Sequence, residues 1–283
     1  MEAAFFDLDK TVIATASMVA FGRPLYKEGM ISRRMLARGL YGQLVYMHLG
    51  ASEQKLSRIR ESLLTLTRGW DQARVCEIVR ETLEDVVEPI VYREALELMA
   101  QHRAEGRKIF IVSASPEEIV APLGEYLDVD ESIASQAMVD DEGRYTGEMA
   151  RYAYGPLKAE IMAEVAAAQG IDLAASYAYS DSYTDAPMLE AVGHPVAVNP
   201  DRVLLKLAKE KGWEVRTFGK PVRLRDRVPV PSRRVTIGAG SGAVAATLSG
   251  VVIWWLRRHA EPPPTRMQQV RRRAASLPPW RRG

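Results

Sequence analysis

The stretch AAFFDLDKT, residues Ala3–Thr11, decides the fold of this chain. Four apolar residues lead directly into two carboxylates, Asp7 and Asp9, that are one residue apart. A short apolar run bounded by polar residues is typical of a buried strand in a parallel sheet. Ligands of such sheets bind beyond the carboxyl ends of the strands, so we expect both carboxylates to lie at the mouth of a site.

The spacing of the two carboxylates indicates their chemistry. In a regular strand Asp7 and Asp9 point to the same face, and two carboxylates that close repel each other unless they share a cation or a proton. Oxygen ligands suit a hard ion such as Mg²⁺. One carboxylate can then attack a substrate while the other transfers protons. A strand end with two solvated acids is the alternative, because so short a motif also occurs by chance.

The next part of the chain reads as helical. After Thr11, apolar residues recur at three- and four-residue spacing for roughly eighty residues, which predicts an all-helical insert over residues 12–87. Each expected helix begins near Ser or Asp, the usual N-cap residues. These helices lie near residues 17–28, 32–49, 52–67 and 71–86.

From Glu88 the pattern alternates between helices and strands. The expected helices cover residues 88–105, a stretch that opens at 115–118, and residues 156–169, 186–192 and 201–212. The expected strands cover residues 108–113, 133–139, 144–148, 177–180, 194–198 and 213–217. This alternation predicts a parallel sheet with right-handed crossovers, in one core domain of residues 1–11 and 88–220.

Ser113 and Lys158 have the positions of phosphate-binding groups. Ser113 ends an expected strand, and the following helix should have Ser115 as N-cap and Pro116 as its first residue. A hydroxyl beside the free amides and positive dipole of a helix start can bind phosphate. Lys158 lies in the first turn of another helix, where the dipole disfavours a cation, and this breach of a local rule indicates function. Taken singly, Ser113 is also an ordinary cap and Lys158 an ordinary solvated lysine.

Asp181 and Asp185 repeat the strand-end pattern of the first motif. Both follow the expected strand 177–180 and flank the turn into the next helix. Helix capping explains one such acid readily and both less readily. The chain thus carries Asp-x-Asp, Ser, Lys and Asp-x-x-x-Asp in one order, a combination far more specific than any of its members.

This order of motifs resembles the haloacid dehalogenase (HAD) superfamily, in particular its IB phosphatases, which include phosphoserine phosphatase. The matching motifs are DLDKT at residues 7–11, IVS at 111–113, Lys158, and SDSYTD at 180–185. The resemblance covers residues 3–217 and implies a HAD-type α/β fold, a Rossmann-like parallel sheet flanked by helices. It also implies that residues 12–87 form an all-helical cap inserted after the first strand.

The resemblance implies a role for each residue of the site. Asp7 is the expected nucleophile, which forms an aspartyl-phosphate, and Asp9 protonates the leaving oxygen and then deprotonates water. The expected Mg²⁺ ligands are Asp7, the backbone carbonyl of Asp9, and Asp181, with Asp185 behind them as an orienting group. The expected phosphate-binding residues are Thr11, which orients the nucleophile loop, Ser113 and Lys158.

Three positions depart from the phosphoserine phosphatase pattern. Ala16 stands where those enzymes carry a substrate-binding Glu, Ser113-Ala114-Ser115 replaces their usual Ser-Gly-Gly, and Thr184 replaces an Asn. The residues expected to bind and transfer phosphate are present, whereas the residue expected to recognise an amino acid is absent. We expect hydrolysis of a phosphomonoester other than phosphoserine.

Composition limits the other chemistries. Cys76 is the only cysteine, which excludes an intrachain disulfide, and the four His residues show no zinc-ligand spacing. The first strand is expected to begin at residue 3, so we expect no secretory signal peptide. From Arg223 onward, 13 Arg and 2 acidic residues give a formal net charge of +11, so the total of +2 leaves −9 for residues 1–222. A basic tail on an acidic body indicates an anionic partner surface.

The tail contains an expected membrane span. Residues 221–234 read as a Pro- and Arg-rich linker, residues 235–256 are 22 residues without a charge, and residues 257–283 read as a basic disordered tail. As a helix, the uncharged segment spans about 33 Å, enough for a hydrocarbon core of about 30 Å. A buried helix of a soluble protein is the alternative. Small residues four apart permit pairing of two copies into a homodimer; they are Gly238, Gly242, Ala246 and Gly250.

These observations lead to one expected function and two alternatives. We expect a Mg²⁺-dependent phosphatase with a cytoplasmic catalytic domain, anchored to the cell membrane as a single-pass protein, that acts on a small phosphorylated substrate or a lipid phosphate. The first alternative is a non-catalytic, membrane-anchored regulatory or interaction protein that keeps the HAD fold, although its carboxylates and Lys158 are intact. The second, nucleic-acid binding, rests on the Arg-rich tail alone, and lipid is favoured because the tail adjoins the expected span.

Overall fold

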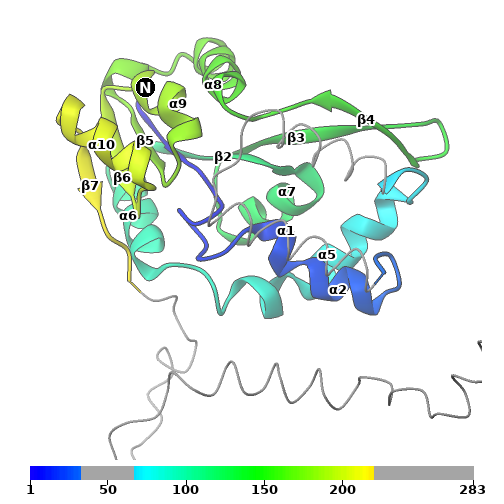
Figure 1. Ribbon diagram of the computed structural model, residues 1–283. Helices are drawn as coiled ribbons and strands as arrows, with labels where there is room; N and C mark the ends of the chain where they lie inside the picture. The colour runs from blue at the N-terminus through cyan, green and yellow to red at the C-terminus, as the bar shows by residue number, and fades with distance from the viewer. Residues whose placement is uncertain (33–66, 220–283) are drawn as a thin grey trace, which may run out of the picture. The chain divides into compact units, whose positions relative to one another are not determined.

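The computed structural model describes residues 1–32 and 67–219 (Figure 1). The expected helices 32–49 and 52–67 lie almost wholly outside the described residues. The same holds for the linker 221–234, the expected span 235–256 and the tail 257–283. Among the described helices, none is both long enough and apolar enough to cross a bilayer.

A seven-stranded sheet organises the described part of the chain. The strand order is β4-β3-β2-β1-β5-β6-β7, and neighbouring strands are parallel except for the antiparallel pair β3–β4. Its strands are β1 (Ala3–Phe6), β2 (Lys108–Pro116), β3 (Glu131–Val139), β4 (Tyr145–Arg151), β5 (Tyr177–Ser180), β6 (His194–Val198) and β7 (Glu214–Arg216). The predicted parallel α/β sheet is confirmed. The direction of strand addition reverses at β1, which is where such sheets bind their ligands.

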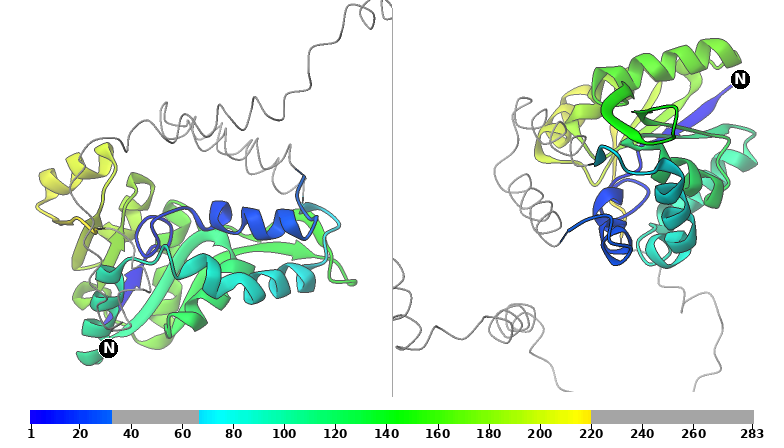
Figure 2. Two further views of the ribbon diagram at one scale, coloured as in Figure 1. Left: turned by 90° about the horizontal axis from the view of Figure 1, so that it is seen from below. Right: turned by 90° about the vertical axis from the view of Figure 1, so that its right-hand side faces the viewer.

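Helices cover both faces of this sheet (Figures 1 and 2). Alternate residues of β1 serve two cores: Ala4 and Phe6 pack with α5, α6 and α7, whereas Ala3 and Phe5 pack with α8, α9 and α10. The helices are α1 (Ser17–Ala20), α2 (Gly22–Lys27), α5 (Gln72–Val87), α6 (Arg93–Ala104), α7 (Glu117–Tyr126), α8 (Pro156–Gln169), α9 (Ala186–Glu190) and α10 (Arg202–Lys211). Two 3₁₀ turns, η1 (Leu173–Ala175) and η2 (Tyr183–Asp185), precede β5 and α9. All four side chains of β1 are fully buried, so the strand places the residue that follows it with little freedom.

The residues just before α5 are hydrogen-bonded to the β3–β4 hairpin. Asp71 caps α5 by accepting a hydrogen bond from the Arg74 amide. Just before α5, the Gly69 amide donates to the Tyr145 carbonyl at 2.8 Å, and the Tyr145 amide donates to the Trp70 carbonyl at 3.0 Å. The hairpin therefore reaches across to the start of α5, as Figure 1 shows. Whether residues 12–87 form a separate cap domain stays a prediction.

Two of the expected helices have clearly different boundaries. The expected helix 88–105 begins only at Arg93, because Glu88 still caps α5 and residues 90–92 pair with residues 12–14. The Ala14 amide donates to the Ile90 carbonyl there, and the Tyr92 amide donates to the Val12 carbonyl. The expected helix 17–28 divides at Phe21 into α1 and α2. The spacing of apolar residues indicates that such a segment is amphipathic, but it does not indicate whether the segment pairs with a distant part of the chain.

The expected capping of the helix after β2 by Ser115 is wrong. Pro116 keeps an extended backbone with φ −60° and ψ 144°, so β2 continues through it and α7 begins one residue later than the pattern predicts. Pro116 is the N-cap residue and not the first residue of the helix. The Ser115 hydroxyl is thereby left for another partner.

Gly193 supplies a test of this fold. A Cβ at Gly193 would lie 1.8 Å from the carbonyl oxygen of Ala174, a backbone atom that cannot move aside without displacing η1. We expect Gly193→Ala in the full chain to lower the free energy of unfolding by about 1–3 kcal/mol, the usual cost of overpacking. Urea denaturation measures this, with Ala168→Ser on the exposed face of α8 as control, for which the change should stay below about 0.5 kcal/mol. An unchanged midpoint for Gly193→Ala would contradict the described turn into β6.

Candidate active site

The first motif lies in a tight loop directly after the central strand. β1 ends at Phe6, and the Asp7 amide donates to the Tyr179 carbonyl of β5 at 2.9 Å. Fully buried Leu8 anchors the loop, and its carbonyl accepts hydrogen bonds from the Val12 and Ile13 amides. The two carboxylates therefore lie beyond the strand end, as expected. They do not lie on a regular strand, so the expectation that they share one face through the strand period does not hold.

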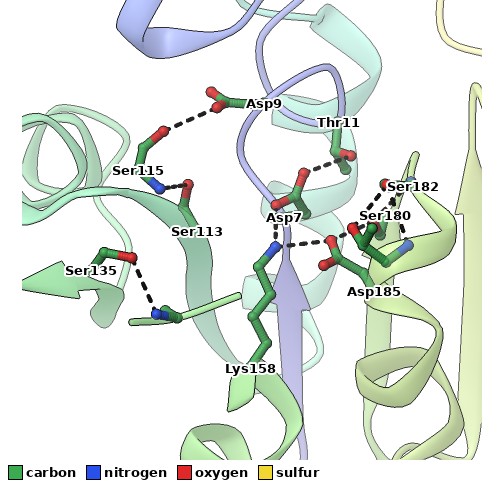
Figure 3. A network of polar contacts seen from close by, with 12 residues as sticks. Asp7, Asp9, Thr11, Ser113, Ser115, Ser135, Lys158, Ser180, Ser182 and Asp185 are labelled. Carbon is green, nitrogen blue, oxygen red and sulfur yellow. Dashed lines mark hydrogen bonds and ion pairs between the residues drawn. The ribbon is translucent and has the colours of Figure 1, made fainter. Parts of the chain in front are cut away.

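Lys158 joins the first motif to the last one (Figure 3). Its Nζ lies 2.6 Å from Oδ1 of Asp7 and 2.8 Å from Oδ2 of Asp185, and its side chain is 3% exposed. Burial opposes the charge of Lys158, but the Asp185 and Asp7 carboxylates outweigh it and raise the pKa of the lysine above its ordinary value. These two ion pairs offset the unfavourable place of a cation in the first turn of α8.

Hydroxyl groups give each of these carboxylates a second partner, on the same oxygen as Lys158 for Asp185 and on the other oxygen for Asp7. The Ser180 hydroxyl donates to Oδ2 of Asp185 at 2.7 Å, and Thr11 Oγ1 donates to Oδ2 of Asp7 at 3.3 Å. Ser180, Thr11 and both carboxylates are buried. Thr11 therefore lies against the carboxylate of Asp7, as the expectation that it orients this loop requires.

Ser113 lies on the other side of Asp7, near the end of β2. Its hydroxyl oxygen accepts a hydrogen bond from the Ser115 amide at 3.1 Å, and the side chain is buried. A hydroxyl that accepts one hydrogen bond still has its own hydrogen to donate. Ser113 can therefore donate to an anionic oxygen placed between β1 and β2.

Asp9 faces a different set of partners from Asp7. Its Oδ1 accepts from the Ser17 amide at 2.7 Å, and its Oδ2 accepts from the Ser115 hydroxyl at 3.0 Å. Burial raises the pKa of Asp9 above its ordinary value, while the hydrogen bonds from Ser17 and Ser115 act in the opposite direction. The two motif carboxylates thus differ in environment, and such a difference allows them separate acid–base roles.

Asp181 completes the carboxylates at this edge. Its side chain is 13% exposed, and its ion-pair partner among the described residues is Lys10, at 4.0 Å. Burial raises the pKa of Asp181 to about 7, the Lys10 ammonium lowers it, and the Asp185 carboxylate raises it. Asp181 therefore has a long ion pair, whereas Asp7 and Asp185 each lie within 2.8 Å of a buried ammonium group.

The charges at this edge fit a divalent cation. Four carboxylates gather there and two ammonium groups face them, an excess of two negative charges; the residues are Asp7, Asp9, Asp181, Asp185, Lys10 and Lys158. Burial raises the pKa of Asp7 well above its ordinary value, the Lys158 ammonium lowers it, and the three neighbouring carboxylates raise it again. Within residues 1–32 and 67–219, no three His, Cys, Asp or Glu side chains are close enough to hold a metal together. Mg²⁺ suits such a site, because it is commonly bound by one or two carboxylates and keeps several waters.

Two residues of this site were not predicted to be part of it. Ser17 was expected only at a helix start and Ser115 only as a cap, yet both hydrogen-bond Asp9. Local patterns explain a Ser at a helix start completely. They therefore give no sign that Ser17 binds Asp9, eight residues earlier, or that Ser115 binds it across 106 residues of sequence. The expected site residues themselves come from four separate segments, and the fold brings them to one edge of the sheet.

Comparison with known proteins agrees with this geometry. The family model for haloacid dehalogenase-like hydrolases matches residues 4–190, which include every residue described above at the site. The chain belongs to this family. As a HAD-family protein it is a hydrolase of the phosphatase type.

Relatives extend the likeness over most of the chain. An inhibition of morphological differentiation protein of Streptomyces azureus is 47% identical over 253 residues, which cover 88% of this chain and 91% of that protein. A probable phosphatase of Mycobacterium tuberculosis is 46% identical over 252 residues, 89% of this chain and 88% of its own length. A solved phosphoserine phosphatase, described as a phospho-aspartyl intermediate analogue, has a TM-score of 0.56 at 19% identity and covers 80% of this chain and 96% of that one. The last likeness shows the HAD fold alone.

The buried Lys158 gives a stability test with a defined pH dependence. We expect Lys158→Met to lower the free energy of unfolding by about 3–5 kcal/mol near neutral pH, because two buried carboxylates lose their shared cation. The pKa of Asp7, already above its ordinary 3.8, rises further without Lys158. When a carboxyl group has a higher pKa in the folded than in the unfolded state, the folded protein becomes less stable as the pH rises from the unfolded-state pKa to the folded-state pKa. The loss of unfolding free energy in Lys158→Met should therefore be smaller in mildly acidic than in mildly alkaline buffer.

Urea denaturation of the full chain at two pH values measures this effect. Lys206→Met on α10 is the matched control, since the Lys206 side chain is 78% exposed and its pairing with Glu210 contributes at most about 1 kcal/mol. A deficit for Lys158→Met no larger than that of the control would show that the buried ion pairs are not formed.

Proposed function

We propose that the protein is a Mg²⁺-dependent phosphomonoester hydrolase that acts through an aspartyl-phosphate on Asp7. The observation that carries this proposal is the buried contact of Asp7 with Lys158, with Asp9 two residues away in separate surroundings. A nucleophile fixed by a cation, beside a carboxyl group free of that cation, is the arrangement that two-step phosphoryl transfer needs. The described helices α1, α2 and α5, which follow β1 directly in the chain, support a place among the IB phosphatases.

The first step forms the phosphoenzyme. Lys158 holds Oδ1 of Asp7, which leaves Oδ2, at 3.3 Å from Thr11, as the attacking oxygen. A bond forms between Oδ2 and phosphorus, and the bond from phosphorus to the leaving oxygen breaks. Asp9 gives its proton to the leaving oxygen, which departs as an alcohol.

The second step releases phosphate. Asp9, now ionised, takes a proton from a water molecule, and the water oxygen attacks phosphorus. The bond between phosphorus and Oδ2 of Asp7 breaks, so the carboxylate is restored and inorganic phosphate leaves. Ser113 and Lys158 bind the phosphoryl oxygens in both steps by donating hydrogen bonds.

Mg²⁺ would be held by Asp7, the backbone carbonyl of Asp9, and Asp181. When bound, it supplies positive charge that stabilises the transferring phosphoryl group and keeps the carboxylates ionised. Asp185 holds Lys158 at 2.8 Å and so keeps the ammonium directed at Asp7. This assignment gives Asp181 a role, since its ion pair with Lys10 is long at 4.0 Å.

The substrate is a phosphomonoester without the amino-acid group of phosphoserine. Ala16 directly precedes α1 and has only a methyl group at the position where an acidic side chain would bind an ammonium group. A non-catalytic regulatory role is the alternative, and it predicts that the protein has no turnover that depends on Asp7.

Loss of Asp7 separates these two functions. In the full chain, 4-nitrophenyl phosphate hydrolysis should require Mg²⁺ and stop on chelation, and Asp7→Asn should lower kcat by at least about a thousandfold, as expected for loss of a nucleophile. Asp181→Asn should instead raise the Mg²⁺ concentration that gives half-maximal rate. Asp141→Asn, an exposed acid in the hairpin turn, is the control and should behave as wild type. Turnover that survives Asp7→Asn would refute the proposed nucleophile. Absence of turnover in the wild-type protein would favour the regulatory role.

We also propose that residues 235–256 anchor the protein to a membrane. The support is in the sequence alone: 22 uncharged residues, with Arg233 and Arg234 before them and Trp254, Trp255 and Arg257 at the far end. A lipid phosphate or another membrane-proximal phosphomonoester would then be the natural substrate, and the small-residue face is a place for a second copy.

Charged substitutions test the anchor. Ala245→Asp together with Ala246→Asp should move the full-length protein from the membrane fraction to the soluble fraction, because each Asp costs about 2.5–3.5 kcal/mol at the centre of a span. Ala274→Asp together with Ala275→Asp, outside the segment, should leave it in the membrane fraction after alkaline extraction. Equal partition of the two variants would contradict a membrane span.

A further inference from the structure

A chain of hydroxyl groups ends on the carboxylate of Asp9. The Ser17 hydroxyl donates to the Ser115 hydroxyl at 2.7 Å, and the Ser115 hydroxyl donates to Oδ2 of Asp9 at 3.0 Å. The Ser17 amide donates separately to Oδ1 at 2.7 Å. Both oxygens of Asp9 are therefore held, one from a backbone amide and one from a side chain.

The two hydroxyl groups that lead to Asp9 lie in the interior of the protein. Ser17 is fully buried and Ser115 is 6% exposed. Ser17 begins α1, the first helix after the nucleophile loop, whereas Ser115 lies near the end of β2. Figure 3 shows Ser115 between Asp9 and Ser113, and the Ser115 amide also donates to the Ser113 hydroxyl. One residue thus contacts both the expected acid–base group and an expected phosphate-binding group.

Ser17 fixes the direction of the hydrogen bond to Asp9. A hydroxyl has a single hydrogen, and that of Ser17 is used on the Ser115 oxygen. The Ser115 oxygen accepts it, so the hydrogen of Ser115 remains for Asp9. The expected capping role would have directed the Ser115 hydroxyl to the amides of α7, but the extended backbone at Pro116 directs it to the site.

We propose that Ser115 is a positioning residue for Asp9, with Ser17 orienting its hydroxyl. This inference rests on the proposed function, because it concerns proton transfer by Asp9. An Asp side chain has two rotatable bonds, and proton transfer requires its carboxyl group within hydrogen-bond reach of the leaving oxygen and then of water. Ser115 limits the rotation from one side, and the Ser17 amide limits it from the other.

A positioning role predicts an effect that depends on the leaving group. The ratio kcat/KM reports the steps through departure of the leaving group. Nitrophenolate is a weak base and departs with little help from an acid, whereas phenoxide is a stronger base and needs the proton of Asp9. Loss of the Ser115 hydroxyl should therefore affect kcat/KM for phenyl phosphate and spare it for 4-nitrophenyl phosphate. The dephosphorylation step, in which Asp9 activates water, should slow for both substrates.

Ser115→Ala in the full chain, assayed with both aryl phosphates and Mg²⁺, tests the proposal. We expect kcat/KM for phenyl phosphate to fall about tenfold or more, part of the roughly 10²–10⁴-fold that a positioned acid contributes. The value for 4-nitrophenyl phosphate should stay within about twofold, while its kcat falls and more phosphoenzyme accumulates. Ser115→Thr, which keeps the hydroxyl, should recover most of the loss. Ser17→Ala should have a smaller effect, because its backbone amide still binds Asp9.

The controls separate this proposal from a structural role and from the proposed function itself. Ser176→Ala removes another buried hydroxyl, which accepts from the Ala3 amide and donates to the Asp172 carbonyl, and it should leave both kcat/KM values unchanged. An equal fall in kcat/KM for the two substrates, or no change for either, would overturn the positioning role while Asp7-dependent hydrolysis stands. Absence of Asp7-dependent hydrolysis in the wild type would overturn both proposals together.

Discussion

Mutual repulsion among the carboxylates at the carboxyl edge of the sheet is the constraint on which the site depends. Lys158 relieves part of it by lying within 2.8 Å of both Asp7 and Asp185, in surroundings almost closed to water. Such a group is costly to bury unless its partners are fixed, and the fully buried β1 strand together with the Ser180 hydroxyl fixes them. The negative charge that remains explains why a divalent cation fits here.

The strand-end carboxylates could be predicted from sequence because the signal is local. An apolar run that stops at Asp7 places that residue at an edge of the sheet whatever the rest of the fold does, and the same holds for Asp181 after β5. The partners of Asp9 could not be predicted, because Ser17 and Ser115 each have a sufficient local explanation as a residue at a helix start. The helix expected over residues 88–105 failed for a related reason, since residues 90–92 pair with residues 12–14 instead of joining the helix.

The two halves of the site divide the chemistry between them. Around Asp7 the partners are a cation and a hydroxyl, which suit a nucleophile that must remain ionised, whereas the neighbouring carboxylates raise its pKa and oppose that state. Around Asp9 the partners are hydroxyl and amide donors from β2 and α1, which hold a carboxyl group in place while it gains and loses a proton. The division follows from the short loop between them, because Leu8 is buried and separates the two side chains.

The most direct test of this account is to trap the phosphoenzyme. The full chain is mixed with an aryl phosphate and Mg²⁺, quenched in acid and reduced with borohydride, which converts an aspartyl-phosphate to homoserine that peptide mass spectrometry locates. The account predicts homoserine at position 7, absent when Mg²⁺ is withheld. Turnover of the same substrate without homoserine at that position would contradict it, and homoserine at Asp9 or Asp181 would assign the nucleophile elsewhere.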